Sequence, residues 1–105
     1  MALLAGSKKI KTAVFISGTG SNLKSLIKFS KLKKSPISIE MIVSNNLKSK
    51  GLAFGKIYKI RKKIFNFKKQ ITAEKEILAQ LKKNKIDLIC LAGFMKILSK
   101  NFILN

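Results

Sequence analysis

The chain has 105 residues, of which 47% are hydrophobic, so it forms one domain at most and has enough apolar residues for a core. Its 23 lysine and arginine residues against four acids give a formal net charge of +19, which attracts anions. No apolar run approaches the roughly 18 residues of a membrane span, and one cysteine without any histidine excludes an internal disulfide and a conventional zinc site.

The first half of the chain predicts two strands with a helix between them. We expect residues 1–9 to be a flexible tail ahead of a single domain that spans residues 10–105. Apolar, β-branched residues over 10–17 predict a strand buried on both faces. Apolar residues at helical spacing predict a helix over 21–32. Pro36 breaks the chain, and a second strand is predicted over 37–43.

The second half continues the alternation. It predicts a weak helix over 48–60, a short strand over 64–67, a helix over 72–84, the most buried strand over 87–92, and the start of another helix over 99–104. Thr72 is the expected N-cap of the third helix, and Glu74 and Glu76 suit the positive end of its dipole.

Strands that alternate with helices predict the α/β class, with an open, mostly parallel sheet and helices on both faces, as in Rossmann-like folds. Ligands of such folds bind at the carboxyl ends of the strands. Residues 18–22, 44–46 and 93–98 follow three predicted strands. We therefore expect these three segments to meet on one rim of the sheet.

The glycine-rich stretch S-G-T-G-S-N, residues 17–22, follows a strand and opens a helix. The first N–H groups of a helix have no partner within it, so such a junction suits an anion and above all a phosphate. The alternative is a tight turn with Ser21 as the helix cap and no ligand. A dinucleotide fingerprint fails because Leu23 stands where a third glycine is required, and no P-loop motif is present. A smaller phosphorylated metabolite remains.

The second motif is L-A-G-F-M-K-I-L, residues 91–98, where a strand ends at a glycine and apolar residues continue. It is equally consistent with an ordinary strand end packed under the next helix and with a wall for a flat apolar ligand. Cys90, inside the preceding strand, is expected to be a small buried apolar residue.

The charge also raises the alternative of a nucleic-acid-binding module. The stretch from Arg61 to Lys69 interleaves cations with Phe65 and Phe67, as single-strand binders can. Against this, the lysines are spread over every segment and only one arginine is present. The abundance of lysine, isoleucine and asparagine is what an A+T-rich genome tends to encode.

The segments "VFISGTGSNLKSLI", "IVSNN" and "DLICLAGFMKILS" together resemble the phosphoribosylglycinamide formyltransferase family, over residues 10–104 and in the same order. The motifs S-G-[NT]-G-S-N and L-A-G-[FY]-M-[RK]-[IL]-L are quite specific to it. The resemblance implies a cytoplasmic enzyme of purine synthesis that transfers a formyl group from 10-formyltetrahydrofolate to glycinamide ribonucleotide, without a metal. Another folate-dependent formyltransferase or deformylase of the same superfamily is the alternative.

The resemblance assigns binding residues to both motifs. Gly20, Ser21 and Asn22 match the loop that holds the ribonucleotide phosphate. The folate-binding segment of the family corresponds to Met95, Lys96, Ile97 and Leu98. Gln70 stands where the family has an arginine that contacts the folate, so this contact is not carried over.

The resemblance covers only the N-terminal half of the family. Its catalytic asparagine, histidine and aspartate begin later, in an N-I-H-P-S motif, and this chain has no histidine. We therefore assign no catalytic residue and expect the chain to be inactive alone. Its expected partners are the phosphoribosyl substrate, the folate and the missing C-terminal half, with no specific nucleic acid and no membrane.

Overall fold

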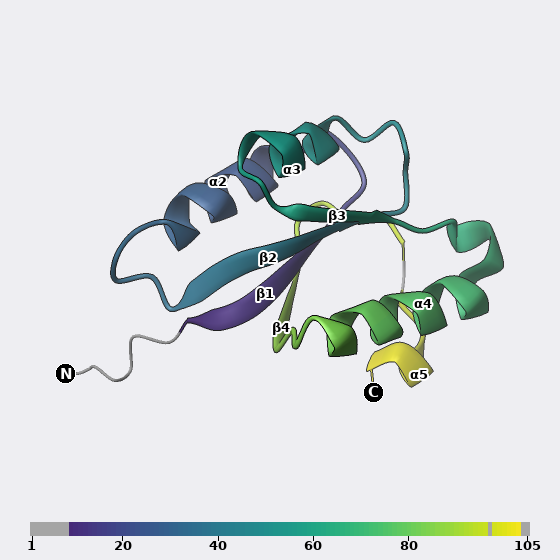
Figure 1. The fold of residues 1–105 in the computed structure, drawn as a ribbon. Helices are drawn as coiled ribbons and strands as arrows, with labels where there is room; N and C mark the ends of the chain where they lie inside the picture. The colour runs from purple at the N-terminus through teal and green to yellow at the C-terminus, as the bar shows by residue number, and fades with distance from the viewer. Residues whose placement is uncertain (1–8, 97, 104–105) are drawn as a thin grey trace.

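The computed structural model describes residues 9–96 and 98–103. Its centre is a four-stranded parallel sheet in the order β3-β2-β1-β4 (Figure 1). The strands are β1 (Ile10–Ile16), β2 (Ile37–Ser44), β3 (Arg61–Ile64) and β4 (Leu88–Leu91). The predicted α/β class with an open parallel sheet is confirmed.

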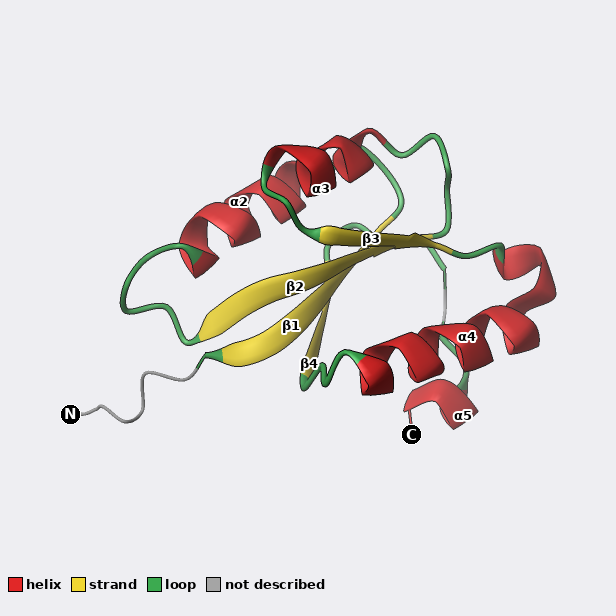
Figure 2. Cartoon of the chain, in the orientation of Figure 1, coloured by secondary structure: helices red, strands yellow, loops and turns green. Residues whose placement is uncertain are grey.

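Helices cover both faces of the sheet, as expected. They are α2 (Ser21–Ser30), α3 (Ala53–Ile57), α4 (Gln70–Lys83) and α5 (Lys100–Ile103), with short 3-10 turns η1 (Lys50–Leu52) and η2 (Phe67–Lys69). Figures 1 and 2 show α2 and α3 on one face and α4 with α5 on the other. Each strand is therefore joined to the next one in sequence by a crossover that returns over one face.

Alternate side chains of β1 enter two separate core layers, because successive strand residues point to opposite faces. Val14 and Ile16 pack with Leu23 and Ile27 of α2. On the other face, Ala13 and Phe15 join a layer with residues of α4 and α5, including Ala73, Ile77, Leu81 and Phe102. Burial on both faces explains why residues 13–16 are uniformly apolar.

The third strand lies earlier than predicted, at Arg61–Ile64 instead of 64–67. Arg61 and Lys62 are exposed and Lys63 is half-buried at the edge of the sheet, where charge is tolerated and hides the strand pattern. Phe65 and Phe67 follow the strand and are only 8% exposed, in the core layer under α4. The apolar pattern of 64–67 therefore marked core contacts beyond the strand.

Thr72 as N-cap is also wrong. Helix α4 begins two residues earlier, at Gln70, and no side chain caps it. The cap in this region belongs to η2, where Asn66 accepts a hydrogen bond from the backbone N–H of Lys68 at 2.9 Å. A 3-10 turn that runs directly into α4 replaces the expected cap.

Residues 87–92 do not form the most buried strand. Strand β4 lies at an edge of the sheet among the described residues, and Leu91 is 58% exposed. Cys90 is half-buried. An apolar run identifies a strand that can be covered on both faces, but it does not say whether a neighbour lies alongside it.

The remaining boundaries differ by a few residues. The first helix ends at Ser30, and the weak helix splits into η1 and α3. Of the predicted tail, residues 1–8 lie outside the described residues, as do Ile97 and residues 104–105. Lys9 is described, and its Nζ donates to the carbonyl oxygens of Ser30 at 2.6 Å and Leu32 at 3.0 Å.

Candidate functional site

The glycine-rich loop connects β1 to α2 at the carboxyl end of the sheet. Gly20 takes a left-handed conformation, with φ 79° and ψ 21°, and is the N-cap residue of α2. No side chain caps this helix, so Ser21 does not act as the cap that the alternative to a phosphate site required. Ser21 and Asn22 are exposed. The first-turn amides of α2 are therefore left to solvent or to a ligand.

A close backbone contact with η1 explains the second glycine. A Cβ on Gly20 would lie 2.6 Å from the Cα of Gly51. The carbonyl oxygen of Gly18 accepts hydrogen bonds from the backbone N–H of Gly51 at 3.1 Å and from the hydroxyl of Ser49 at 2.6 Å. By contrast, nothing lies within 4 Å of a Cβ added to Gly18. Gly20 and Gly51 thus fix the loop, and Gly18 faces open space.

The serine that precedes this loop joins three segments of the rim. The hydroxyl of Ser17 donates to Oδ1 of Asn45 at 2.5 Å and accepts from the backbone N–H of Met95 at 2.9 Å. Asn45 follows β2, and Met95 follows β4. The expectation that the three strand ends meet on one rim is therefore confirmed at this point.

A hollow of about 430 Å³ lies on the same rim. Its lining combines polar residues from the loops after all four strands with two apolar ones: Ser17, Asn45, Asn46, Asn66, Phe67, Lys68, Met95 and Lys96. It contains amide and hydroxyl groups and two cations, but no carboxylate. The hollow therefore favours an anionic or carbonyl-rich ligand over a cation.

The described residues of the segment assigned to the folate, Met95, Lys96 and Leu98, do not all lie on the same surface. Met95 is 78% exposed, Lys96 is exposed, and Leu98 is half-buried, while Ile97 lies outside the described residues. Met95 and Lys96 line the rim hollow. Lys96 and Leu98 line a second, mostly apolar groove of about 670 Å³ along β4. The segment therefore separates a polar hollow from an apolar one.

Glu74 of α4 anchors the far end of this segment. It is only 6% exposed and accepts hydrogen bonds from the Ser99 backbone N–H at 2.8 Å, the Ser99 hydroxyl, and Nε2 of Gln70 at 2.9 Å. Burial raises the pKa of the Glu74 carboxyl, but these hydrogen bonds outweigh burial and hold the pKa below its ordinary value. Ser99 in turn accepts from the Phe102 N–H in the first turn of α5.

The segment is thus held at both ends, by Ser17 before it and by Glu74 after it. Gln70, which stands where the resembling family has a folate-contacting arginine, points its amide toward Glu74. Neither anchor was identified from the sequence. Ser17 falls in a motif whose glycines drew attention, and Glu74 was assigned to the helix dipole.

The rim carries little acid–base chemistry. Its described polar groups are hydroxyls, amides, backbone groups and lysines, and proton transfer at neutral pH requires a group that titrates near it. Asp87 lies just before β4, at the opposite end of the strands. Among residues 9–96 and 98–103, no three or more histidine, cysteine, aspartate or glutamate side chains gather where they could hold a metal. The described groups of the site can therefore bind a ligand and hold it in position.

The structure removes the two aromatic residues on which the nucleic-acid alternative relied. Phe65 and Phe67 lie in the core, and Phe67 packs edge-on against Phe94 with ring centroids 5.5 Å apart. Buried rings cannot stack on bases as single-strand recognition requires. In the part of the chain that the structure describes, no helix is long and apolar enough to cross a membrane.

Comparison with known proteins points to one family. The sequence profile described as "Formyl transferase" matches residues 10–105. The human trifunctional purine biosynthetic protein adenosine-3 is 37% identical over 99 residues, which are 91% of this chain and 10% of that protein. The phosphoribosylglycinamide formyltransferase of Haemophilus influenzae is 36% identical over 95 residues, 88% of this chain and 45% of the enzyme.

Comparison with solved structures points to the same family. Phosphoribosylglycinamide formyltransferase from Brucella melitensis superposes with a TM-score of 0.87 at 36% identity, over 91% of this chain and 52% of the enzyme. The Anaplasma phagocytophilum enzyme gives 0.83 at 36% identity, over 92% and 46%. This chain spans about half the length of these single-function relatives. It therefore belongs to the formyl transferase family, in the group of the phosphoribosylglycinamide formyltransferases.

Proposed function

We propose that this chain supplies the substrate-positioning half of a phosphoribosylglycinamide formyltransferase. The loop Gly20-Ser21-Asn22 holds the phosphate of glycinamide ribonucleotide, and the segment Met95–Leu98 lies against the folate of 10-formyltetrahydrofolate. In the reaction, the ribonucleotide amine forms a bond to the formyl carbon, the bond from that carbon to the folate nitrogen breaks, and the amine proton passes to the folate. This chain positions both reactants.

One observation carries the proposal: a left-handed glycine opens an uncapped helix on the same rim as the segment after β4. Several N–H groups in the first turn of α2 can converge on one anion, and the positive end of the helix dipole favours it. The net charge of +19 draws anions toward the protein without providing a specific contact. The other folate-dependent enzymes of the superfamily fit less well, because their resemblance to this glycine loop is poor.

The chain is proposed to be inactive by itself. No histidine is present in the 105 residues, and the described rim offers no carboxylate to assist proton transfer. Loss of a single oxyanion donor alone costs about a hundredfold or more in rate. Positioning is still a large share of the barrier, since holding two reactants in place contributes about 7–11 kcal/mol in well-oriented systems.

The test is a titration of the isotope-labelled chain with glycinamide ribonucleotide, followed by NMR. The amides of residues 20–23 are expected to shift first and most. The matched ligand without its phosphate should cause much smaller shifts, because the proposed contacts are to the phosphate. Equal shifts with both ligands, or a response confined to other loops, would contradict the proposal.

Gly18→Val gives a mutational test that spares the fold. Space around Gly18 is open, so the new side chain protrudes over the loop without a clash inside the protein. We expect at least tenfold weaker binding of the ribonucleotide with unchanged thermal stability. Ser25→Ala is the control, because Ser25 is exposed one turn further along α2 and its hydroxyl reaches only the carbonyl oxygen of Ser21.

A further inference from the structure

A second hollow, of about 980 Å³, lies at the opposite end of the strands from the rim. It is lined where β1, β2 and β3 begin and where α2, α3 and α4 end. Eight lysine or arginine side chains line it: two at the start of β1, one after α2, three from the end of α3 to the start of β3, and two at the end of α4. Its single carboxylate is Glu40. We call it the basic hollow.

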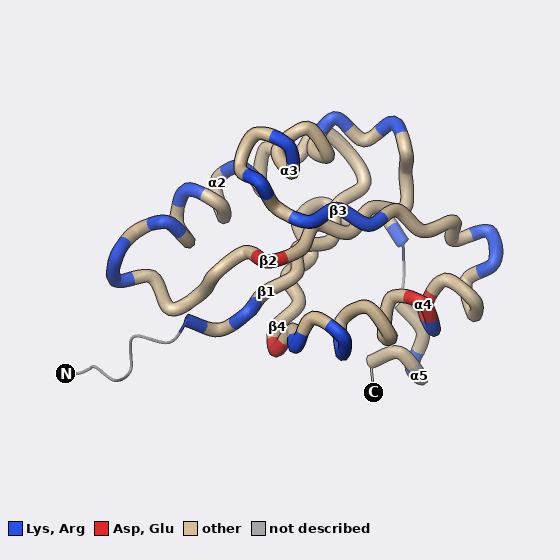
Figure 3. The backbone as a smooth tube through the Cα atoms, in the orientation of Figure 1, with Lys and Arg blue, Asp and Glu red and all other residues tan. Residues whose placement is uncertain are grey.

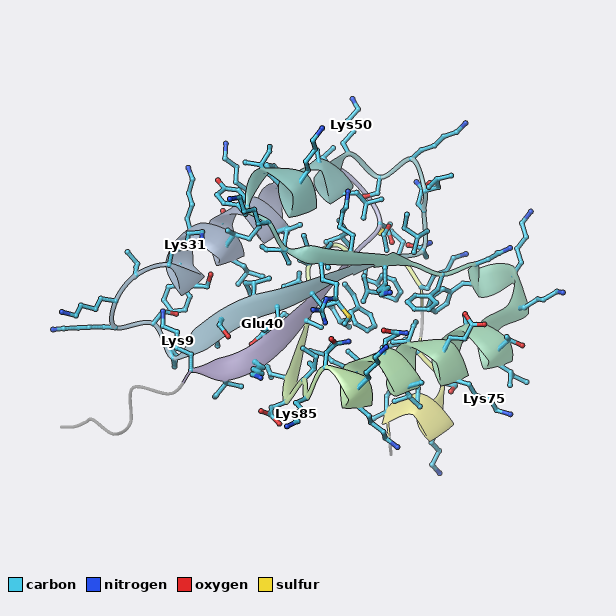
Figure 4. The ribbon with its side chains drawn as sticks, viewed as in Figure 1. Lys9, Lys31, Glu40, Lys50, Lys75 and Lys85 are labelled. Atoms are coloured by element: carbon cyan, nitrogen blue, oxygen red, sulfur yellow. The ribbon has the colours of Figure 1, made fainter. Side chains whose placement is uncertain are left out.

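Figure 3 shows that lysine and arginine residues lie in several separate segments around this end of the molecule. In Figure 4, Lys9, Lys31 and Lys85 lie around Glu40, whereas Lys50 and Lys75 point away from this end of the molecule. Glu40 is exposed, and no ion pair joins it to the cations of the hollow among the described residues. Ion pairing with Glu40 therefore does not neutralise the charges of the hollow.

Part of this charge has a structural purpose. Helices α2, α3 and α4 end here, and cations stabilise the carbonyl ends of helices. Lys9 is used in this way, since its Nζ contacts two carbonyl oxygens at the end of α2. Three helix ends contribute at most about half a negative charge each, so with Glu40 they leave an excess of at least about five positive charges.

We propose that the basic hollow binds the phosphate backbone of single-stranded RNA without reading its sequence. Long lysine stems from separate elements present spaced charges, which match phosphates that are separated by sugars. Only one arginine, Arg61, is available for bidentate contacts to bases. The only aromatic ring in the lining, Tyr58, is half-buried and has the Lys31 ammonium 5.6 Å from its centre. Recognition thus rests on charge.

This site is separate from the proposed phosphate loop and independent of formyl transfer. A hollow of this size admits a few nucleotides of one strand, whereas a duplex presents a rigid convex surface. Binding is expected to weaken steeply with salt, with a slope of about −0.7 per phosphate contact for single strands.

The experiment measures binding of a fluorescent 12-nucleotide oligouridylate by anisotropy at several salt concentrations. The hollow variant carries Lys31→Gln, Lys56→Gln and Lys83→Gln. The control variant carries Lys24→Gln, Lys50→Gln and Lys75→Gln, so both lose three positive charges, and all six side chains are exposed. Glutamine preserves helix propensity and avoids placing a negative charge at a helix end.

Loss of three phosphate contacts should lower affinity about a hundredfold at 100 mM salt and flatten the salt slope by about 2. The control should lose at most a fewfold, because exposed charges beyond about 10 Å are largely screened at this salt. Equal losses in both variants would overturn the proposal, since binding would then reflect net charge alone.

Amide shifts of the unmodified chain give a readout that does not depend on the variants. On addition of the oligouridylate they should cluster at residues 30–31, 56–61 and 83–85. Clustering at residues 18–23 instead would overturn the assignment, because the RNA would then occupy the phosphate loop. Inorganic polyphosphate is expected to compete for the hollow, and binding of polyphosphate without any binding of RNA would also overturn it.

Discussion

Replacement of Glu74 tests whether a buried carboxylate without a cationic partner holds the segment after β4. In the fold it accepts three hydrogen bonds, two from Ser99 and one from Gln70. Glu74→Ala removes the acceptor and leaves the Ser99 donors partly buried and unpaired. An unpaired buried donor costs about 1–3 kcal/mol, so the total loss of unfolding free energy should be about 2–4 kcal/mol.

For a domain of this size, a loss of 2–4 kcal/mol lowers the melting temperature by roughly 10–20 °C. Glu74→Gln keeps the shape of the side chain but faces donors with an NH₂ group, and we expect a loss of about 1–2 kcal/mol. Glu76→Gln is the matched control, because Glu76 is exposed on the same helix. Its effect should stay within about 0.5 kcal/mol.

The same carboxylate makes stability depend on pH. Its pKa is lower in the folded than in the unfolded chain, so the folded state binds its proton less readily. The stabilisation is fully present above the unfolded pKa, which is about 4.3, and is lost as pH falls through the folded pKa. Glu74→Gln should remove this part of the acid dependence in urea unfolding between pH 3 and pH 6. An unchanged acid profile, or an equal change in Glu76→Gln, would refute the reasoning.

Three further outcomes are expected. Gly20→Ala should destabilise the chain by about 2–4 kcal/mol in urea unfolding, because alanine would have to adopt the left-handed φ and its Cβ would lie 2.6 Å from the η1 backbone. Gly18→Ala should leave the stability unchanged or raise it slightly. Equal effects of the two substitutions would contradict this. Ser17→Ala should increase hydrogen exchange of the Met95 amide at least tenfold, since that amide loses its acceptor; unchanged protection would refute the anchor. The purified chain should show no turnover of glycinamide ribonucleotide with 10-formyltetrahydrofolate in a formyl-transfer assay, and turnover above the solvent rate would refute this.

The parts of the fold that repeat a local pattern could be predicted from the sequence. Residues 13–16 and 41–43 are apolar and buried on both faces of the sheet, so these parts of the two strands carry a clear apolar signal. The glycine-rich loop could be placed because a left-handed backbone position favours glycine, and two glycines stand between a predicted strand and a predicted helix. The shared rim then followed from parallel topology alone.

The failures have a common physical origin in contacts between distant segments. Arg61–Ile64 pairs with β2 even though its composition suggests solvent, because an edge strand needs only backbone groups to join a sheet. Glu74 lies in a helix by sequence, but two of the hydrogen bonds that satisfy its buried carboxylate come from Ser99, which is 25 residues away. Neither partner is visible in a local window of sequence.

The placement of β1 between β2 and β4 has a consequence for how the protein is made. Val14 pairs with Cys90, which leaves the ribosome 76 residues later. At about 5–20 residues per second, β1 waits roughly 4–15 s for this neighbour. Throughout that interval one edge of an apolar strand is open to pairing with other chains. The lysines spread along the nascent chain keep such chains apart by repulsion, so the charge of the protein also protects its synthesis.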